Sequence, residues 1–255
     1  MDWSLRRQLI YALAIAIILA TVTVLAMRDN LFPKPTCSDK KMNGPEEGVD
    51  CGGVCNLRCS EQVRPLTVEW SKAVMVEEGV YDLVAMNNNA NIDNASKQIG
   101  FSFILYDKLG TVLGIFSGST TAPLGGEFPI ILPSIALPSA PDSVITTLND
   151  GPHYKVNESP SSPTVRIGKH RYEQDTVSRV FATVSNTKRI ELNKLPIRAV
   201  LFDNKNNAYA VGETLIPYLD KEGVVEIVFT WRNVLPVAPT RIEVYPIFNP
   251  FNTPE

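Results

Sequence analysis

Four cysteines in one short window carry the most specific chemistry in this sequence. They are Cys37, Cys51, Cys55 and Cys59, and the chain of 255 residues has no others. Clustered Cys in even number, in a chain that the N-terminus marks as exported, indicate two disulfides, and four Cys allow three pairings. So short a segment has too little apolar surface for its own core, so the bridges must supply its order.

The same window also offers two kinds of metal ligand. Four thiolates could hold Zn²⁺ tetrahedrally, but the paired Cys-x-x-Cys spacing of structural zinc sites is missing. Carboxylate and amide oxygens interleaved with glycine would suit Ca²⁺, although they do not follow the spacing of an EF-hand. These oxygens belong to Asp39, Asn43, Glu47 and Asp50. Both metals stand as alternatives to disulfides with solvated acidic turns; we predict no metal and no cofactor.

No arrangement of residues typical of an enzyme is found in the chain. The sequence has no glycine-rich phosphate loop, no nucleophile elbow and no His-Glu-x-x-His. His153 and His170 have no recognisable nucleophile near them, and we interpret them as surface or interdomain residues. Asp107 and Asp203 could be paired carboxylates, but each opens a tight turn, where Asp accepts backbone N–H hydrogen bonds. We therefore expect no catalytic residue and no enzyme activity.

An uncharged run near the N-terminus is the first element of the chain. Residues 8–27 are almost wholly apolar, and as a helix they would reach about 30 Å, the thickness of a hydrocarbon core. Arg6 and Arg7 precede the run, so the positive-inside rule places residues 1–7 in the cytoplasm and the rest outside. A cleaved signal peptide is the alternative, but the run is long for one and its end is a poor cleavage site. We expect an uncleaved, single-pass anchor in the cell membrane.

The charge balance restricts the partners. Lys and Arg number 24 against 27 Asp and Glu, the net charge is −3, and no basic block is present. A nucleic-acid surface needs clustered Lys and Arg, so nucleic acid is not expected as a partner. The 19 prolines, together with many short apolar runs, favour strands and turns over helices.

The remainder of the chain contains the same pattern twice. Residues 101–106 alternate with the period of a strand, and Asp107 then opens a turn in which a glycine takes positive φ. The same device recurs at Asp203, 96 residues later. The nearly identical segments 136–141 and 234–239 lie 98 residues apart. Landmarks in the same order at nearly the same offset predict two copies of one fold.

We predict a mostly β protein with a transmembrane helix, a disulfide-rich segment and two tandem immunoglobulin-like β-sandwiches. The predicted parts are a cytoplasmic N-terminus (1–7), a transmembrane helix (8–27), a Cys-rich neck (28–64), a first sandwich (65–150), a linker (151–163) and a second sandwich (164–255). The predicted strands are 66–76, 80–87, 99–106, 111–116, 127–132 and 143–148, then 165–167, 179–185, 195–202, 208–213, 224–231 and 241–247. Trp70 and Trp231 fall in strands and are expected in the cores. The apolar run 128–138 is either a core strand with a packed loop or an exposed edge for a partner.

The Cys-rich segment resembles a short motif of predicted exported bacterial proteins. The resemblance covers residues 37–59 and includes the run Gly-Val-Asp-Cys-Gly-Gly. The order of anchor, Cys motif and two domains is similar to uncharacterised single-pass envelope proteins of small-genome, candidate-phylum bacteria. These resemblances imply export and architecture, and no activity.

The first domain resembles the small extracellular β-sandwich family named for Phe-x-Leu-Tyr-Asp. The signature is carried by Phe103, Leu105, Tyr106 and Asp107, for which the resemblance implies structural roles. The second copy, which ends at Asp203, has Ala in place of the Phe and Phe in place of the Tyr. These changes keep the alternation and weaken the assignment there.

Together these features predict a non-enzymatic module displayed in the cell envelope. It would have a structural, adhesion or assembly role and act by protein–protein contact through strand edges or loops. The alternative is a ligand-binding accessory subunit of an envelope transport or secretion complex. The expected partners are the membrane and envelope proteins; the pattern does not predict the oligomeric state.

Overall fold

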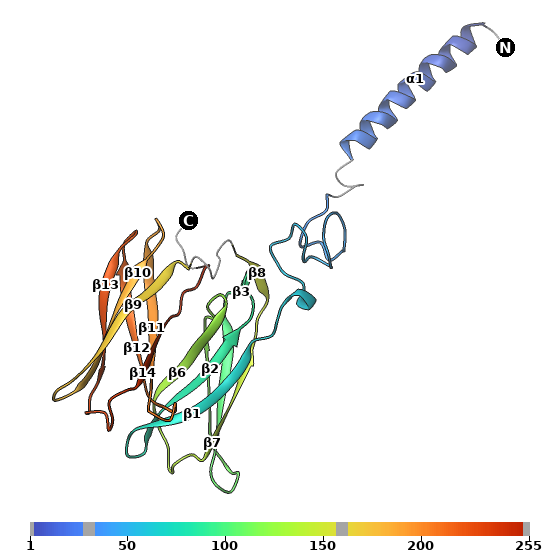
Figure 1. Cartoon of the computed structure of the whole chain (residues 1–255). Coiled ribbons are helices and arrows are strands. Elements are labelled where there is room, and N and C mark those ends of the chain that lie inside the picture. Colours follow the sequence, from blue (N-terminus) through green and yellow to red (C-terminus); the bar gives the residue numbers. More distant parts are fainter. Residues whose placement is uncertain (1–2, 28–33, 157–162, 252–255) are drawn as a thin grey trace. The chain divides into compact units, whose positions relative to one another are not determined.

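The structure is a computed structural model that describes residues 3–27, 34–156 and 163–251 (Figure 1). It is mostly β, with 51% of the described residues in strands and 11% in helix, which confirms the predicted fold class at this level. The chain divides into two compact units, residues 1–55 and 56–255. Residues 28–33 of the predicted neck and 157–162 of the predicted linker lie outside the described residues.

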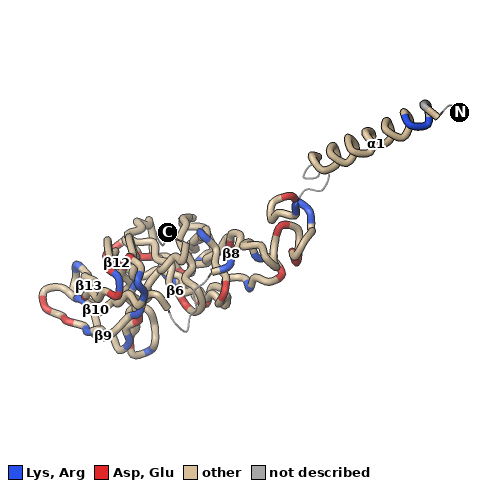
Figure 2. Tube along the Cα trace, turned by 90° about the horizontal axis from the view of Figure 1, so that it is seen from above, with Lys and Arg blue, Asp and Glu red and all other residues tan. Residues whose placement is uncertain are grey.

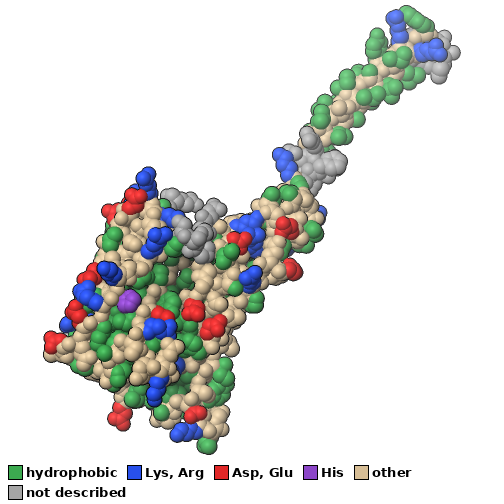
Figure 3. All heavy atoms as spheres, viewed as in Figure 1, with side chains coloured by type: hydrophobic (Ala, Val, Ile, Leu, Met, Phe, Trp, Pro, Cys, Tyr) green, Lys and Arg blue, Asp and Glu red, His purple; other side chains and the backbone are tan. Residues whose placement is uncertain are grey.

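Helix α1 (Trp3–Ala26) contains an apolar stretch, Arg6–Ala26, that is long enough to cross a membrane. Its apolar side chains are exposed along its length (Figure 3), and basic residues lie near its N-terminal end (Figure 2). The hydroxyls of Thr21 and Thr23 donate hydrogen bonds of 2.8 Å to carbonyl oxygens four residues earlier. These polar groups are therefore satisfied within the helix, as an apolar surrounding requires.

Two three-stranded antiparallel sheets form the first sandwich. The sheet around β2, called the β2 sheet, has the order β1–β2–β6, and the β4 sheet has the order β5–β4–β7. Their strands are β1 (Thr67–Glu77), β2 (Val80–Asn89), β4 (Ile99–Tyr106), β5 (Val112–Thr120), β6 (Gly126–Ala136) and β7 (Ser143–Asn149). Alternate side chains of both sheets meet in one core, with Leu83 and Phe128 from one sheet and Phe103 and Leu105 from the other.

A small additional sheet extends this sandwich. Strand β3 (Asn94–Ser96) pairs with β8 (His153–Lys155) in antiparallel register. The short helix η1 (Ser60–Gln62) precedes β1. Because β8 lies inside the segment predicted as a linker, the first sandwich extends further along the chain than its predicted end at residue 150.

The second sandwich repeats the strand order of the first. The β10 sheet has the order β13–β10–β9 and the β11 sheet the order β12–β11–β14. Their strands are β9 (Val165–Gln174), β10 (Ser178–Asn186), β11 (Leu192–Phe202), β12 (Ala208–Leu219), β13 (Val224–Trp231) and β14 (Arg241–Pro246). Val180 and Val184 from β10 meet Ile197 and Leu201 from β11 in its core. The β10 sheet is thus the counterpart of the β2 sheet, and the β11 sheet is the counterpart of the β4 sheet.

The two sandwiches pack against each other through sheet faces that point away from their own cores. The β2 sheet and the β11 sheet contribute four residues each to this sandwich interface. The eight residues are Val74, Val84, Met86 and Ile131, and Val200, Phe202, Ala208 and Val211. Trp70 packs edge-on against Phe202, with 6.4 Å between ring centroids, so it lies at this interface and the prediction that it belongs to a sandwich core was wrong. Trp231 packs against the core of the second sandwich.

The apolar run 128–138 is explained by this packing. Phe128 and Ile130 point into the first core, whereas Ile131 points into the sandwich interface. A strand covered on both faces needs apolar residues at both parities, which removes the usual alternation. Residues 128–131 are therefore part of a core strand, as the first interpretation held, whereas β6 is the edge strand of the β2 sheet and part of the run after residue 132 is exposed.

Candidate interaction surface

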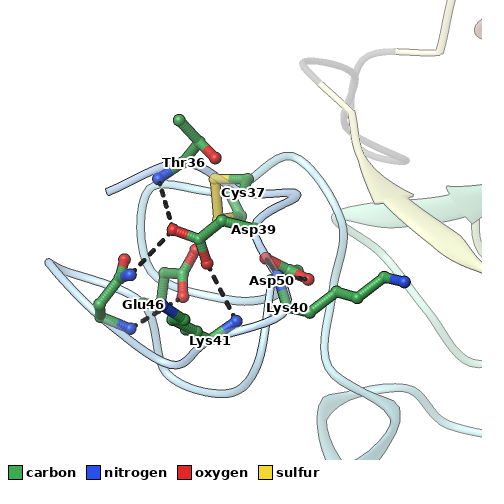
Figure 4. The surroundings of a disulfide bond; sticks show 9 residues. Thr36, Cys37, Asp39, Lys40, Lys41, Glu46 and Asp50 are labelled. Carbon is green, nitrogen blue, oxygen red and sulfur yellow. Dashed lines mark hydrogen bonds between the residues drawn. A yellow bond between two sulfur atoms is a disulfide. The ribbon is translucent and has the colours of Figure 1, made fainter. Parts of the chain in front are cut away.

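The Cys-rich segment is held by disulfides. Cys37 bonds to Cys55, 18 residues along the chain, with 5.6 Å between their Cα atoms (Figure 4). Cys51 and Cys59 are disulfide-bonded as well, and the described residues contain no free cysteine. This confirms the two predicted disulfides. Cys37, Cys55 and a nearby glutamate converge as metal ligands would, but a bridged sulfur is not a thiolate and cannot serve as the zinc ligand that was considered.

The acidic residues of this segment bind N–H groups of the protein itself. Asp39 accepts hydrogen bonds of 2.9 Å from the backbone N–H of Lys41 and from the amide of Asn43 (Figure 4). The bond from Asn43 is the main reason why the pKa of Asp39 lies below its usual value. Both oxygens of Asp50 accept from the N–H of Lys40, at 3.1 and 2.9 Å. These carboxylates therefore stabilise the turns by accepting N–H groups of the protein, which argues against the calcium alternative.

Asp107 and Asp203 close equivalent hairpin turns. In each case Oδ1 accepts backbone N–H groups from the residues two and four positions later, all at 2.8 Å. The third residue of each turn has positive φ: +78° at Gly110 and +64° at Asn206. The hydrogen bond from the N–H of Asn207 is the largest cause that lowers the pKa of Asp203. Both residues serve the turns, and each belongs to its own sandwich.

The remaining signature residues also lie in structural positions. Phe103 and Leu105 are fully buried in the core of the first sandwich, whereas Tyr106 is half-buried on the outer face of the same strand. In the second copy Ala199 lies in the core, and Phe202 belongs to the sandwich interface.

His153 is buried, and the prediction that it lies in a linker as a surface or interdomain residue was wrong. It is 3% exposed in β8, with Nδ1 2.7 Å from Oδ1 of Asn94 and Nε2 2.9 Å from both oxygens of Asp150. Both ring nitrogens are therefore within hydrogen-bonding distance of side chains of the same sandwich. The reason is the pairing of β8 with β3, which draws this part of the chain into the first sandwich. His170 is exposed on β9.

The outer face of the β4 sheet differs from an ordinary solvated surface. Ile104 lies between Ile115 and Ile145 in register, so three isoleucines form one row across the sheet. Ile115 is 61% exposed and Ile145 51%. Tyr106 pairs with Val112 beside this row. We call these five residues the isoleucine face.

The isoleucine face continues into small polar residues and meets no charge. Ser102 lies opposite Ser117 on one side and Thr147 on the other, and none of the outward residues of β4, β5 and β7 is charged. Sequence reasoning missed this surface. The signal was present at Ile104, an apolar residue between two core residues of β4, because apolar side chains at both parities indicate a strand that is covered on both faces.

A cavity lies at the junction of the two sandwiches. It has a volume of about 200 Å³ and is lined by residues that include Pro123, Pro163, Tyr245 and Phe248. Burial, followed by the hydrogen bond to Glu243, raises the pKa of Tyr245. Ligand pockets usually hold about 300–1,000 Å³, so this cavity is small for a drug-sized ligand.

Comparisons with known proteins add no family. No family model matches the chain, and no curated protein matches it. Among solved structures, the crystal structure of red sea bream transglutaminase is similar at a TM-score of 0.24 and 13% identity. The match covers 72% of this chain and 29% of that chain. A likeness at this level carries no argument about activity.

Proposed function

We propose that this chain is a single-pass, membrane-anchored module of the cell envelope that acts by protein–protein contact and not by catalysis. The observation that carries the proposal is the isoleucine face. Three isoleucines in one row on an open sheet face, with no charged residue among the outward residues of their strands, have the character of an interface core.

In this proposal α1 is an uncleaved signal anchor with its N-terminus in the cytoplasm. Arg6 and Arg7 at its start support this orientation, since the positive-inside rule keeps such residues on the cytoplasmic side. The four bridged cysteines support an oxidising compartment for the rest of the chain. Both sandwiches are then extracytoplasmic, and their repeated hairpins and strand order support an immunoglobulin-like class.

A residue-specific photo-crosslinker tests this function in the cells that make the protein. The crosslinker is placed at position 115 of the full-length chain, on the isoleucine face, or at position 228, which is exposed on the β10 sheet. Protein adducts that form from position 115 and not from position 228 are the expected result. An absence of protein adducts at position 115 above the level at position 228 would contradict the proposal.

The second candidate function is the ligand-binding accessory subunit, which the cavity beside Tyr245 and Phe248 favours. Its size restricts it to a small ligand or to one end of a larger one. A saturable thermal shift with a small ligand, lost in Phe248→Ala, would support this function. No shift across a set of small apolar and aromatic ligands would leave the contact function as the better account.

A further inference from the structure

The repeat identifies what the isoleucine face corresponds to in the second sandwich. Four residues of the β11 sheet belong to the sandwich interface, and the residues 96 positions earlier belong to the isoleucine face. The equivalent pairs are Val200 and Ile104, Phe202 and Tyr106, Ala208 and Val112, and Val211 and Ile115. Every member of both sets is apolar or aromatic.

Strand pairing shows that this equivalence is structural. Val200 lies opposite Val211 as Ile104 lies opposite Ile115, and Phe202 lies opposite Ala208 as Tyr106 lies opposite Val112. Both hairpins also carry a register irregularity at the same step, directly before Phe202 and directly before Tyr106. Side chains at equivalent positions therefore leave equivalent sheets on the same face.

The two sandwiches treat this face in opposite ways. In the second sandwich Val200 is fully buried and Val211 is 3% exposed, because the outer face of the β2 sheet covers them. In the first sandwich the equivalent of Val211, Ile115, is open to solvent. The chain thus shows what this kind of face packs against, which is the apolar outer face of another β-sheet.

A second chain could in principle repeat the sandwich interface between molecules, but this head-to-tail arrangement is unfavourable. It would place the β10 sheet of another copy, the counterpart of the β2 sheet, on the isoleucine face. The outer face of the β10 sheet carries Arg171, which lies 4.1 Å from the ring centroid of Phe181 and pairs with Glu173 and Glu226. Burying these ion pairs against isoleucine would remove the water around the charged groups, and isoleucine offers no hydrogen-bond partner in its place.

We propose that the isoleucine face is covered by the isoleucine face of a second copy of this chain, in a two-fold symmetric dimer. In such a contact each surface meets itself, so a face without charge brings no like charges together. It also supplies the apolar sheet face that the internal interface shows to be the fitting partner. The inference rests on the proposed function and names its partner. Anchoring of both copies in one membrane raises their effective concentration.

Self-association of the full-length chain in detergent micelles is the test. Sedimentation over a range of concentrations is measured for the wild type, for Ile115→Lys and for the matched control Val228→Lys on the β10 sheet. The wild type and the control should dimerise with the same affinity. Ile115→Lys should weaken the dimer at least about tenfold, because two-fold symmetry brings two lysines into an apolar contact. Thermal melting checks that each variant is folded, and Ile115→Ser replaces Ile115→Lys if that variant does not fold.

Three outcomes would overturn the dimer. They are a wild type that is monomeric at all concentrations, a dimer that Ile115→Lys leaves unchanged, and a dimer that Val228→Lys weakens equally. The photo-crosslinking experiment separates this failure from a failure of the proposed function. Adducts from position 115 to a different protein, with a monomeric purified chain, would reject the dimer and keep the contact function, whereas no protein adduct at all would reject both.

Discussion

At the scale of single residues, aspartate carboxylates in this protein stabilise turns by accepting backbone N–H groups. Asp107 and Asp203 each accept two backbone N–H groups, and in the Cys-rich segment Asp39 accepts the N–H of Lys41 and Asp50 that of Lys40. A turn that must present two N–H groups to one oxygen is stabilised most by an ionised side chain. The negative charge therefore contributes to stability, which makes the contribution depend on pH.

The pH dependence of Asp203 has a definite sign. Its folded pKa lies below the ordinary value of 3.8, so its contribution is complete above that value and is lost as the pH falls through the folded pKa. Asp203→Asn keeps an oxygen acceptor in the turn but removes the charge. We expect the melting temperature of the wild type to fall more steeply than that of Asp203→Asn below about pH 4. Circular dichroism melts at stepped pH measure this, with Asp175→Asn as the control from another turn; parallel curves for the wild type and Asp203→Asn would contradict the assignment.

At the scale of elements, a buried arginine fastens the second sandwich to the first. Arg198 on β11 is 7% exposed, and it donates to the carbonyl oxygen of Pro129 on β6 at 2.8 Å and to Glu213 on β12 at 2.6 Å. Lys72 of β1 donates to the carbonyl oxygen of Ala208 at 2.8 Å. These bonds fix the register of the two sheets, which apolar contacts alone leave free to slide.

Removal of Arg198 should therefore destabilise the pair of sandwiches. Arg198→Ala leaves the carbonyl oxygen of Pro129, Glu213 and the hydroxyl of Thr120 without their charged donor, and we expect a loss of about 1–3 kcal/mol in the free energy of unfolding. Urea denaturation measures this loss. Arg166→Ala, at an exposed position of β9, serves as the control and should lie within about 0.5 kcal/mol of the wild type. An equal effect of both substitutions would show that Arg198 does not fasten the interface.

The disulfides stabilise the Cys-rich segment and not the sandwiches. The bridge from Cys37 to Cys55 closes a segment with no helix or strand among its described residues, so the bridge is the main source of its order. The double variant Cys37→Ser and Cys55→Ser should be cleaved within residues 37–55 by a protease that leaves the wild type intact. Mass spectrometry of the fragments measures this, and unchanged cleavage would show that the segment is ordered without its bridge.

At the scale of the whole molecule, residues 56–255 hold two sandwiches whose outer faces share an apolar interface. A domain pair that buries such a surface unfolds as one cooperative unit when the interface contributes much of the stability of either half. We expect a single calorimetric transition for this unit.

Matched substitutions at equivalent positions of the repeat test this cooperativity. Val200→Asp places an unpaired charge in the sandwich interface, costs about 3 kcal/mol or more, and should split the single transition into two. Ile104→Asp makes the same change at the equivalent position of the isoleucine face, and there a single transition should persist. Two transitions in the wild type, or none gained by Val200→Asp, would show that the sandwiches unfold independently.

Much of the strand layout follows from alternation alone. The segments 99–106 and 224–231 were predicted with the bounds that the structure has, because one face of each strand is buried in a core. Strands β3 and β8 were missed, since three residues are too few for a period and hydrogen bonds such as that between Asn94 and His153 hold them together.

Faces are harder to predict than strands. Alternation marks Ile104 and Val200 as apolar residues on the outer side, but it does not say what covers them. Val200 is covered by the β2 sheet, whose strands β1 and β2 lie more than a hundred residues earlier in the sequence, and Ile104 is half-buried on the isoleucine face. Whether such a face is covered depends on how whole domains pack together, and local sequence patterns contain no information on that packing. The pairing of the four cysteines was left open because their spacing permits three pairings.

The attachment of residues 56–58 to β8 has a mechanical consequence. Leu57 bridges Tyr154, the N–H of Arg58 donates to the carbonyl oxygen of His153, and Arg58 forms an ion pair with Asp93. Tension that arrives along the chain from its N-terminal side meets these bonds before it reaches β1. Several backbone bonds then share the pull, and the outermost strand of the first sandwich is shielded from being peeled away. Buried His153 is part of this attachment, because its carbonyl oxygen accepts from Arg58 and its ring contacts Asn94. A substitution of His153 should therefore lower the force at which the first sandwich unfolds more than it lowers the melting temperature.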